Sequence, residues 1–210
     1  TVSGRSGSRP EVHALLADMP MAILDIGWPG LGLNGLASGR LDYAWKGDRS
    51  GRADLKIRGL SRAGLVLASK PIDVGLAAAI SGNKAALRAV AVSDGKTLGR
   101  AQARFAPIGG GPVLAELLNA PLFAQLRYAG PADTLWRLSG TELCDLTGPV
   151  EIGADIGGRL VDPVIRGSLR SRGARLESAV TGTVIDQLTA EARFTGPRLV
   201  FSRLAGTTPG

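Results

Sequence analysis

The stretch GGRLVDPVIRGSLRSRGARLESAVTG, residues 157–182, decides the fold class of this chain. Apolar and charged residues alternate along it, and glycines interrupt it repeatedly. Alternation with a period of two places apolar side chains on one face of a β-strand and charged side chains on the other. The stretch has no histidine or cysteine, and its acidic residues have the pattern of a solvated face. It therefore predicts strands with one apolar face to bury and no catalytic chemistry.

The same alternation extends over much of the chain. In GRLDYAW, residues 39–45, the side chains of Leu41 and Tyr43 fall on one face with an aspartate between them. Similar runs, separated by turn residues, recur before and after the middle of the chain. We predict a first β segment at residues 39–108 and a second at residues 141–210, with about a dozen strands in all.

The other regions predict different structure. Residues 1–38 are interpreted as an N-terminal loop and a short helical or extended segment, with helical turns over residues 11–19. Residues 109–140 are predicted to be a helix and a linker, because leucines recur at three- and four-residue steps over residues 113–128. We interpret all four regions as one domain excised from a longer chain.

Composition supports many short strands. The chain has 210 residues, 44% of them hydrophobic, which is enough to bury a core. Only 4% are aromatic and 30 are glycine, as in strands joined by tight turns. The net charge is +7, but the arginines are spread about one per strand, as on a solvated sheet face. We therefore expect no nucleic-acid partner. If these charges have a function, we interpret it as attraction to anionic lipid head groups.

Residues that usually carry catalytic or metal chemistry are scarce. His13 and Cys144 are each the only residue of their kind, whereas zinc sites and hydrolase triads need several partners. Acidic residues such as Asp155 and Glu177 lie at strand spacing among arginines, as surface charges do. We expect the chain to have no enzymatic activity, no metal and no cofactor.

A long sheet with one apolar face has three ways to bury that face: a closed barrel, a sandwich or a trough that holds a guest. Barrels and sandwiches fill a dense core with aromatic and branched side chains, and this chain supplies mostly alanine and glycine instead. Glycine within strands permits sharp curvature. We therefore expect a mainly β fold, in which a long curved antiparallel or mixed sheet forms a taco-like trough with a hydrophobic groove. An amphipathic helix is expected near residues 113–128.

Such a groove suits lipid acyl chains better than a small molecule. With strands about 4.8 Å apart, a dozen strands extend over roughly 58 Å. Each buried methylene contributes about 0.8 kcal/mol, so exposing a sixteen-carbon chain to water costs on the order of 13 kcal/mol. The residues expected to form the lipid-binding groove share the apolar faces of their strands. They are Leu41, Tyr43, Trp45, Leu55, Ile57, Ile72, Val74, Leu76, Ile80, Ile152, Ile156, Ile165, Leu169, Leu176, Val180, Leu188, Phe194, Leu199 and Phe201.

Several stretches resemble the TamB family, the translocation and assembly module proteins. Residues 145–206 look like the C-terminal region of that family, above all in the phrase G-x-L-x-D-P-x-I-x-G-x-L at residues 158–169. Residues 128–140, YAGPADTLWRLSG, and residues 29–43, PGLGLNGLASGRLDY, are also similar to it. The likeness covers most of the chain, although other AsmA-like lipid-transfer proteins share this strand pattern.

The resemblance implies a cellular location and binding partners, which the spacing of residues alone does not indicate. Members of the family are anchored in the inner membrane, cross the periplasm and form a taco-shaped β-sheet, similar in role to bridge-like lipid transfer proteins. Phospholipid is then the expected cargo, and a TamA-like outer-membrane barrel of the BamA family is the expected partner. The resemblance also implies a periplasmic location, inner-membrane anchoring of the full-length protein and a role in outer-membrane protein assembly. No catalytic motif comes with the family.

Three further functions stay open at this point: a scaffold, an enzyme and, from the charge alone, a nucleic-acid binder, which a flat salt dependence of DNA retention would remove. The chain would act as a scaffold if its trough or free edge strand paired with strands of nascent outer-membrane or autotransporter proteins by β-augmentation. Lipid adducts from crosslinkers in the groove would favour the conduit, and peptide adducts would favour the scaffold. An enzyme is the weakest alternative, because only surface-like acidic pairs support it.

Overall fold

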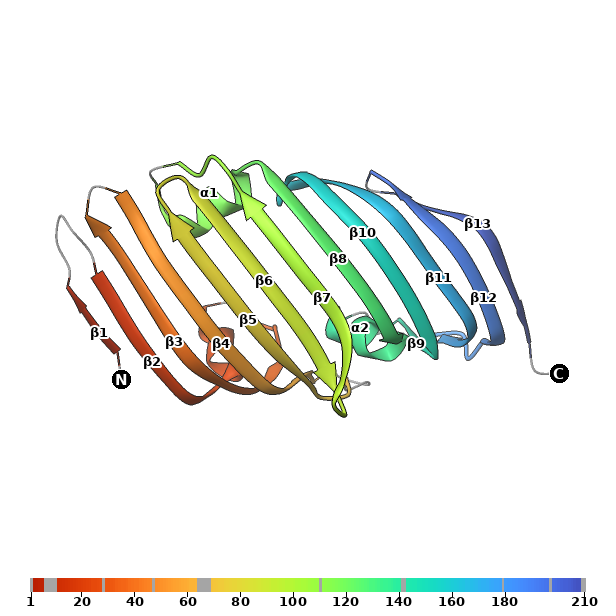
Figure 1. Cartoon of the computed structure of the whole chain (residues 1–210). Coiled ribbons are helices and arrows are strands. Elements are labelled where there is room, and N and C mark those ends of the chain that lie inside the picture. Colours follow the sequence, from red (N-terminus) through yellow and green to blue (C-terminus); the bar gives the residue numbers. More distant parts are fainter. Residues whose placement is uncertain are drawn as a thin grey trace.

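The chain forms one open, curved β-sheet with three short helical segments (Figure 1). A computed structural model describes residues 2–5, 11–27, 29–46, 48–63, 69–109, 111–140, 143–178, 180–196 and 198–208. Within these residues thirteen strands make a single sheet, and every strand pair is antiparallel. Neighbouring strands follow the order of the chain from β1 to β13, except that β9 lies off this path and pairs with β11.

The strands differ in length, from four residues in β1 and β9 to seventeen in β11. Their bounds are β1 Val2–Arg5, β2 Glu11–Pro20, β3 Leu33–Lys46, β4 Asp48–Arg62, β5 Ile72–Ser81, β6 Lys84–Ser93, β7 Lys96–Phe105, β8 Leu122–Pro131, β9 Cys144–Thr147, β10 Pro149–Arg159, β11 Asp162–Ser178, β12 Val184–Thr195 and β13 Arg198–Thr207. The helical segments are the 3-10 helix η1, Met21–Ile26, and the α-helices α1, Val113–Asn119, and α2, Ala132–Leu138.

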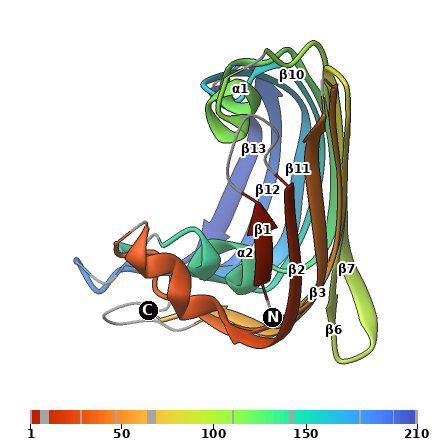
Figure 2. The same cartoon turned by 90° about the vertical axis from the view of Figure 1, so that its left-hand side faces the viewer.

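The sheet curves across its strands, and the helical segments lie on its concave side (Figure 2). The helix α1 lies at one end of the strands, and η1 and α2 lie at the other end. We call these two ends the α1 rim and the α2 rim. The described helices thus flank the concave face rather than crossing its middle.

Two glycines inside strands allow neighbouring backbones to approach more closely than other residues permit. A Cβ atom at Gly39 of β3 would lie 2.1 Å from the carbonyl oxygen of Asp54. A Cβ atom at Gly167 of β11 would lie 2.0 Å from the carbonyl oxygen of Gly153. Both glycines also have positive φ angles, of 147° and 156°. These positions require glycine, and local distortion of this kind lets a sheet curve.

The buried core is divided between the two rims. Beneath α1, the side chains of Phe105, Ile108 and Leu122 form one cluster of buried residues. Beside α2, the side chains of Tyr128 and Val150 form a second cluster with Ala132. Each cluster is small, so most of the concave face lies between them.

The predicted fold class is confirmed: the protein is mainly β, and its curved sheet is open. The strands expected from alternation are present on both sides of residues 109–121, and the turn at Asp94 and Gly95 joins β6 to β7 as a hairpin. Both turn residues have positive φ angles, 49° and 74°, as the tight turns favoured in hairpins require.

Two local predictions were wrong. Residues 11–19 are not helical but belong to β2, where Val12 and Ala14 pair with residues of β3 across the sheet. The helix expected over residues 113–128 ends at Asn119, because Pro121 interrupts it and β8 follows. Since β8 pairs with both β7 and β10, the two expected β segments form one continuous sheet.

Two other parts of the predicted outline also differ. The linker expected after Gly130 contains the helix α2. Of the predicted N-terminal loop, residues 2–5 form β1, whereas residue 1 and residues 6–10 lie outside the described residues.

Candidate functional site

The strand register aligns apolar side chains into rows that run across the concave face. Two central rows lie between the rims, and we call them the groove floor. The first row is Leu41, Ala53, Ala78, Leu87, Ala103, Ala124, Ile156 and Ile165. The second row is Gly39, Leu55, Leu76, Ala89, Ala101, Leu126, Ala154, Gly167, Phe194 and Leu199.

The groove floor is shielded mainly by its own neighbours. Most of its side chains are half-buried, as Leu55, Leu76 and Leu126 are, although they belong to the middle of long strands. In the described part of the chain, the segments on the concave side are η1, α1 and α2, and these lie at the rims (Figure 2). An apolar surface of this extent is unusual for a soluble monomer and generally marks a binding surface.

A distinct hollow lies where the floor meets the α1 rim. Its volume is about 390 Å³, which falls within the range of ligand pockets, roughly 300–1,000 Å³. Its lining includes the apolar side chains of Val12, Leu41, Tyr43, Ile80 and Val113. The hollow thus extends over β2, β3, β4 and β5 of the sheet and reaches the first residue of α1.

Most of the predicted groove residues lie together on the concave face. On the floor itself are Leu41, Leu55, Leu76, Ile156, Ile165, Phe194 and Leu199. In the rows nearer the α1 rim are Tyr43, Trp45 and Ile80. In the row nearer the α2 rim are Ile57, Val74, Ile152, Leu169 and Phe201.

Four predicted residues do not belong to this surface. Val180 lies in the turn between β11 and β12 and is 74% exposed, so its assignment to the groove was wrong. Ile72 and Leu188 are buried core residues. Leu176 pairs with Leu146 of β9, on the far side of the bulged part of β11.

The predicted groove residues include none from β6, β7 or β8, although these strands contribute to the floor. Alanines such as Ala89 and Ala101 form much of the floor there, and alanine gives a weak hydrophobic signal. The residues Leu122 to Tyr128 do alternate with a period of two, but the leucine spacing of a helix concealed that pattern. In β7 the alternation of Ala101 and Ala103 with Arg100, Gln102 and Arg104 was a signal that could have located this part.

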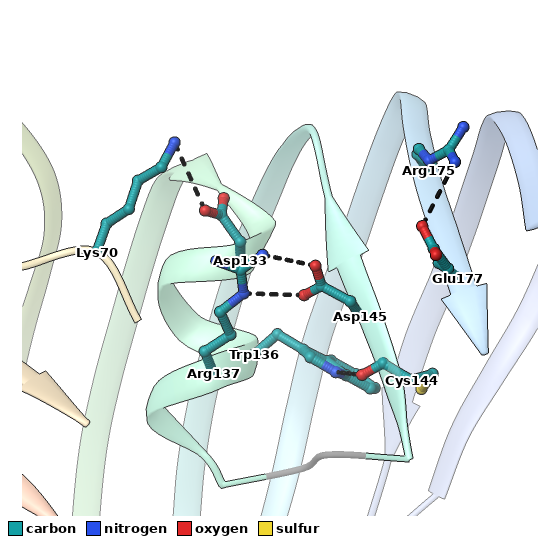
Figure 3. Close-up of polar contacts among 8 residues, drawn as sticks. All are labelled: Lys70, Asp133, Trp136, Arg137, Cys144, Asp145, Arg175 and Glu177. Carbon is teal, nitrogen blue, oxygen red and sulfur yellow. Dashed lines mark hydrogen bonds and ion pairs between the residues drawn. The ribbon is translucent and has the colours of Figure 1, made fainter. Parts of the chain in front are cut away.

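The α2 rim is held by side-chain contacts (Figure 3). Arg137 of α2 forms two hydrogen bonds with the carboxylate of Asp145 in β9, at 3.0 and 2.5 Å. Asp145 raises the pKa of Arg137 above its ordinary value. The indole nitrogen of Trp136 donates to the carbonyl oxygen of Cys144 at 2.7 Å, and Lys70 lies 3.7 Å from the buried carboxylate of Asp133. These contacts fix α2 to β9 and to the segment before β5.

Exposed charges pair along the strands. Arg127 contacts the Asp155 carboxylate at 2.9 Å, and this hydrogen bond holds the pKa of Asp155 below its usual value. His13 lies 2.7 Å from the carboxylate of Asp42, which raises the pKa of the imidazole. Among the described residues, no three histidine, cysteine or acidic side chains are grouped closely enough to hold a metal ion. These contacts are ion pairs of a solvated sheet surface.

Comparisons with other proteins leave the family unassigned. No protein-family model, curated protein or solved structure matches the chain. No helix in the described ranges is long and apolar enough to cross a membrane. The resemblance to the TamB family stays a prediction from the quoted residues, and the function is argued from the concave face.

Proposed function

We propose that the chain holds the acyl chains of phospholipids on its concave apolar face and carries them along the sheet without catalysing a reaction. The observation that supports this most is the continuity of the groove floor. Its rows cross ten neighbouring strands, β3 to β8 and β10 to β13, without a charged side chain. A small-molecule site would need a closed pocket with converging polar groups instead.

The dimensions of the floor suit a chain-like guest. Nine strand spacings of about 4.8 Å give a length of roughly 43 Å. A guest that moves along such a surface keeps its methylenes away from water at every step, so it avoids a cost of about 0.8 kcal/mol for each one. In β6 and β7 the floor residues are Leu87 and three alanines, Ala89, Ala101 and Ala103, so few large side chains obstruct movement there.

The resemblance of residues 145–206 to the TamB family supplies the proposed setting. In that setting the chain lies in the periplasm as part of a protein anchored in the inner membrane. It carries phospholipid toward the outer membrane and supports outer-membrane protein assembly with a TamA-like barrel. Only the quoted residues support this part of the proposal, and the concave face supports the lipid cargo independently.

A charge placed on the groove floor tests the proposal. Leu76 lies in the centre of the floor, and Ala77 is the next residue of β5, exposed on the opposite face. We expect the purified wild-type chain to retain phospholipid in native mass spectrometry, and Leu76→Asp to lose it while its circular dichroism stays that of a β-sheet. Ala77→Asp should retain lipid like the wild type, because it adds the same charge on the convex face.

Two results would contradict the proposal. A wild-type chain that binds no phospholipid, even when purified from lipid-rich membranes, would remove the cargo. Unfolding of Leu76→Asp together with retention of lipid by partly folded protein would make Leu76 an ordinary core residue.

A second candidate is a scaffold that binds other β-strands, and one feature favours it. The strand β13 pairs only with β12 among the described residues, so its outer edge is open. Its side chains Val200, Phe201 and Leu204 are 53%, 47% and 60% exposed. An open apolar edge is a template for β-augmentation. A photo-crosslinker at position 76 that yields lipid adducts favours the conduit, and one at position 200 that yields peptide adducts favours the scaffold.

A further inference from the structure

Arg49 is a buried cation without a counter-ion among the described residues. It is the second residue of β4 and is only 5% exposed. Its Nη1 atom is buried and has no hydrogen-bond partner among the described residues, and no described carboxylate lies within ion-pair distance of its guanidinium. Burial of an unpaired charge is strongly unfavourable, so a buried guanidinium with an unsatisfied nitrogen requires an explanation.

The guanidinium is placed by contacts at the α1 rim. Its carbon atom lies 5.1 Å from the centroid of the Trp45 ring, a cation–π distance. Its Nη2 atom donates to the carbonyl oxygen of Gly111 at 2.6 Å, two residues before α1 begins. The nearest acid along that segment, Glu116, instead accepts hydrogen bonds from the backbone nitrogens of Gly109 and Gly111. The positive charge therefore remains unneutralised.

Arg49 stands at the end of the apolar hollow. The pair Arg49 and Trp45 is the next pair on the concave face after Gly51 and Tyr43, and both of the latter line the hollow. Val113, on the α1 side of the hollow, follows Gly111 by two residues. A cation thus adjoins a cavity of about 390 Å³ whose lining is apolar. An apolar cavity that ends at an unpaired guanidinium matches an amphiphile with an anionic head.

We propose that Arg49 binds the phosphate of a phospholipid head group at the α1 rim, while the adjoining part of an acyl chain occupies the hollow. This inference rests on the proposed function and names the head-group position on the same groove. A phosphate would replace the carbonyl oxygen of Gly111 on Nη2 and supply the missing acceptor for Nη1. Guanidinium and phosphate form two parallel charge-assisted hydrogen bonds, which are stronger than the bond to a neutral carbonyl.

Binding of matched lipids tests the inference. The probes are dipalmitoyl phosphatidylglycerol and dipalmitoylglycerol, which have the same acyl chains and differ in the phosphate head group. Native mass spectrometry of the whole 210-residue chain gives an apparent Kd for each. We expect the wild type to bind the phospholipid at least tenfold more tightly, and Arg49→Gln to remove that preference without weakening the binding of dipalmitoylglycerol. Arg49→Lys should keep part of the preference, because it keeps the charge but not the planar pair of donors.

The matched control is Lys56→Gln. It removes one positive charge from β4, seven residues further on, where the side chain is exposed on the convex face and does not line the hollow. We expect this variant to keep the wild-type preference. Circular dichroism of each variant establishes that it is folded, and the wild-type comparison of the two lipids decides the question even if an Arg49 variant does not fold.

The outcomes separate this inference from the proposed function. If the wild type binds both lipids equally, the groove remains and the phosphate site is wrong. If Arg49→Gln weakens the binding of both lipids equally, Arg49 only fastens the segment before α1. The proposed phosphate site is then again wrong. If the wild type binds neither lipid, the proposed function and the phosphate site both fail.

Discussion

The two rims of the groove are built differently. At the α2 rim, Arg137 and Trp136 form hydrogen bonds with β9, and the backbone nitrogen of Ala132 donates to the carbonyl oxygen of Gly148 at 2.7 Å. At the α1 rim, the described polar contacts of the segment before the helix include the backbone bonds to Glu116, the bond from the Ile108 nitrogen to the carbonyl oxygen of Asn83 at 2.8 Å, and the single bond from Arg49. One rim is thus fastened by paired charges, whereas at the other no described carboxylate pairs with the cation.

This difference indicates which side of the groove can respond to a guest. A rim held by an ion pair between half-buried side chains keeps its position whether or not a lipid is present. A rim whose cation lacks a counter-ion gains stability only when an anion arrives. The comparison therefore predicts that lipid binding changes the α1 rim more than the α2 rim.

The largest expected effect comes from breaking the α2 rim. The side chains of Arg137 and Asp145 are only 18% and 20% exposed, so Arg137→Met leaves the carboxylate partly buried without its partner. Because solvent still reaches the pair, we expect a loss of about 1–2 kcal/mol in the free energy of unfolding. Urea denaturation monitored by circular dichroism measures it. The melting temperature should fall by about 2–8 °C, for a chain of this length.

An exposed ion pair near the same rim provides the control for that change. Arg175 lies 3.4 Å from Glu177 (Figure 3) and 2.8 Å from Asp186, and all three side chains are substantially exposed. Arg175→Gln should leave the urea midpoint nearly unchanged, because solvent screens such pairs. Equal losses in the two variants would mean that the α2 rim is no more firmly fastened than the open surface, and the contrast between the rims would disappear.

A smaller effect is expected at the α1 rim. The carboxylate of Glu116 accepts hydrogen bonds from Gly109 at 2.8 Å and from Gly111 at 2.9 Å, and Glu116→Gln leaves one acceptor oxygen for both donors. We expect a loss of about 1 kcal/mol or less. Amide hydrogen exchange should become faster at residues 109–119 and stay unchanged at α2. Faster exchange at both rims would show that they open together.

Strands were predictable from the sequence where one face is clearly apolar and the other clearly charged. Leu55 and Ile57 alternate with Lys56 and Arg58, and that part of β4 was predicted. In β8 the alternation of Leu122, Ala124, Leu126 and Tyr128 competes with leucines at helical spacing, and the helix was preferred. Pairing with β7 and β10 makes these residues a strand rather than a helix, and the paired residues lie far away in the sequence.

The groove was only partly predictable for the same reason. The face of each strand follows from its own sequence, and so most of the large groove residues were predicted. The position of the rims depends on where α1 and α2 cover the strands, which alternation does not reveal. That is why Ile72 was taken for a groove residue although it is buried. The burial of Arg49 was equally invisible, since its place on β4 resembles that of the exposed Arg52.

The smallest predicted effect concerns alkaline pH at the α2 rim. Tyr128 is 5% exposed, and its hydroxyl donates to the carbonyl oxygen of Pro131, which precedes α2, at 2.7 Å. Burial, with the negative charge of Asp133 nearby, raises the pKa of Tyr128 above its ordinary value of 10.0. A raised folded-state pKa means that this stabilisation is fully present below the unfolded pKa and is lost as the pH rises through the folded pKa.

Because the pKa of Tyr128 is raised in the folded state, the stability of the α2 rim should fall at alkaline pH. Above about pH 10, the unfolded chain loses the Tyr128 proton more readily than the folded chain, and a phenolate can no longer donate to Pro131. The urea midpoint should therefore fall further between pH 8 and pH 10.5 in the wild type than in Tyr128→Phe, which has no proton to lose there. Amide exchange should place the extra loss in α2 rather than in α1. The same alkaline loss in both proteins would mean that other groups govern it, and the α2 rim would not depend on the neutral phenol.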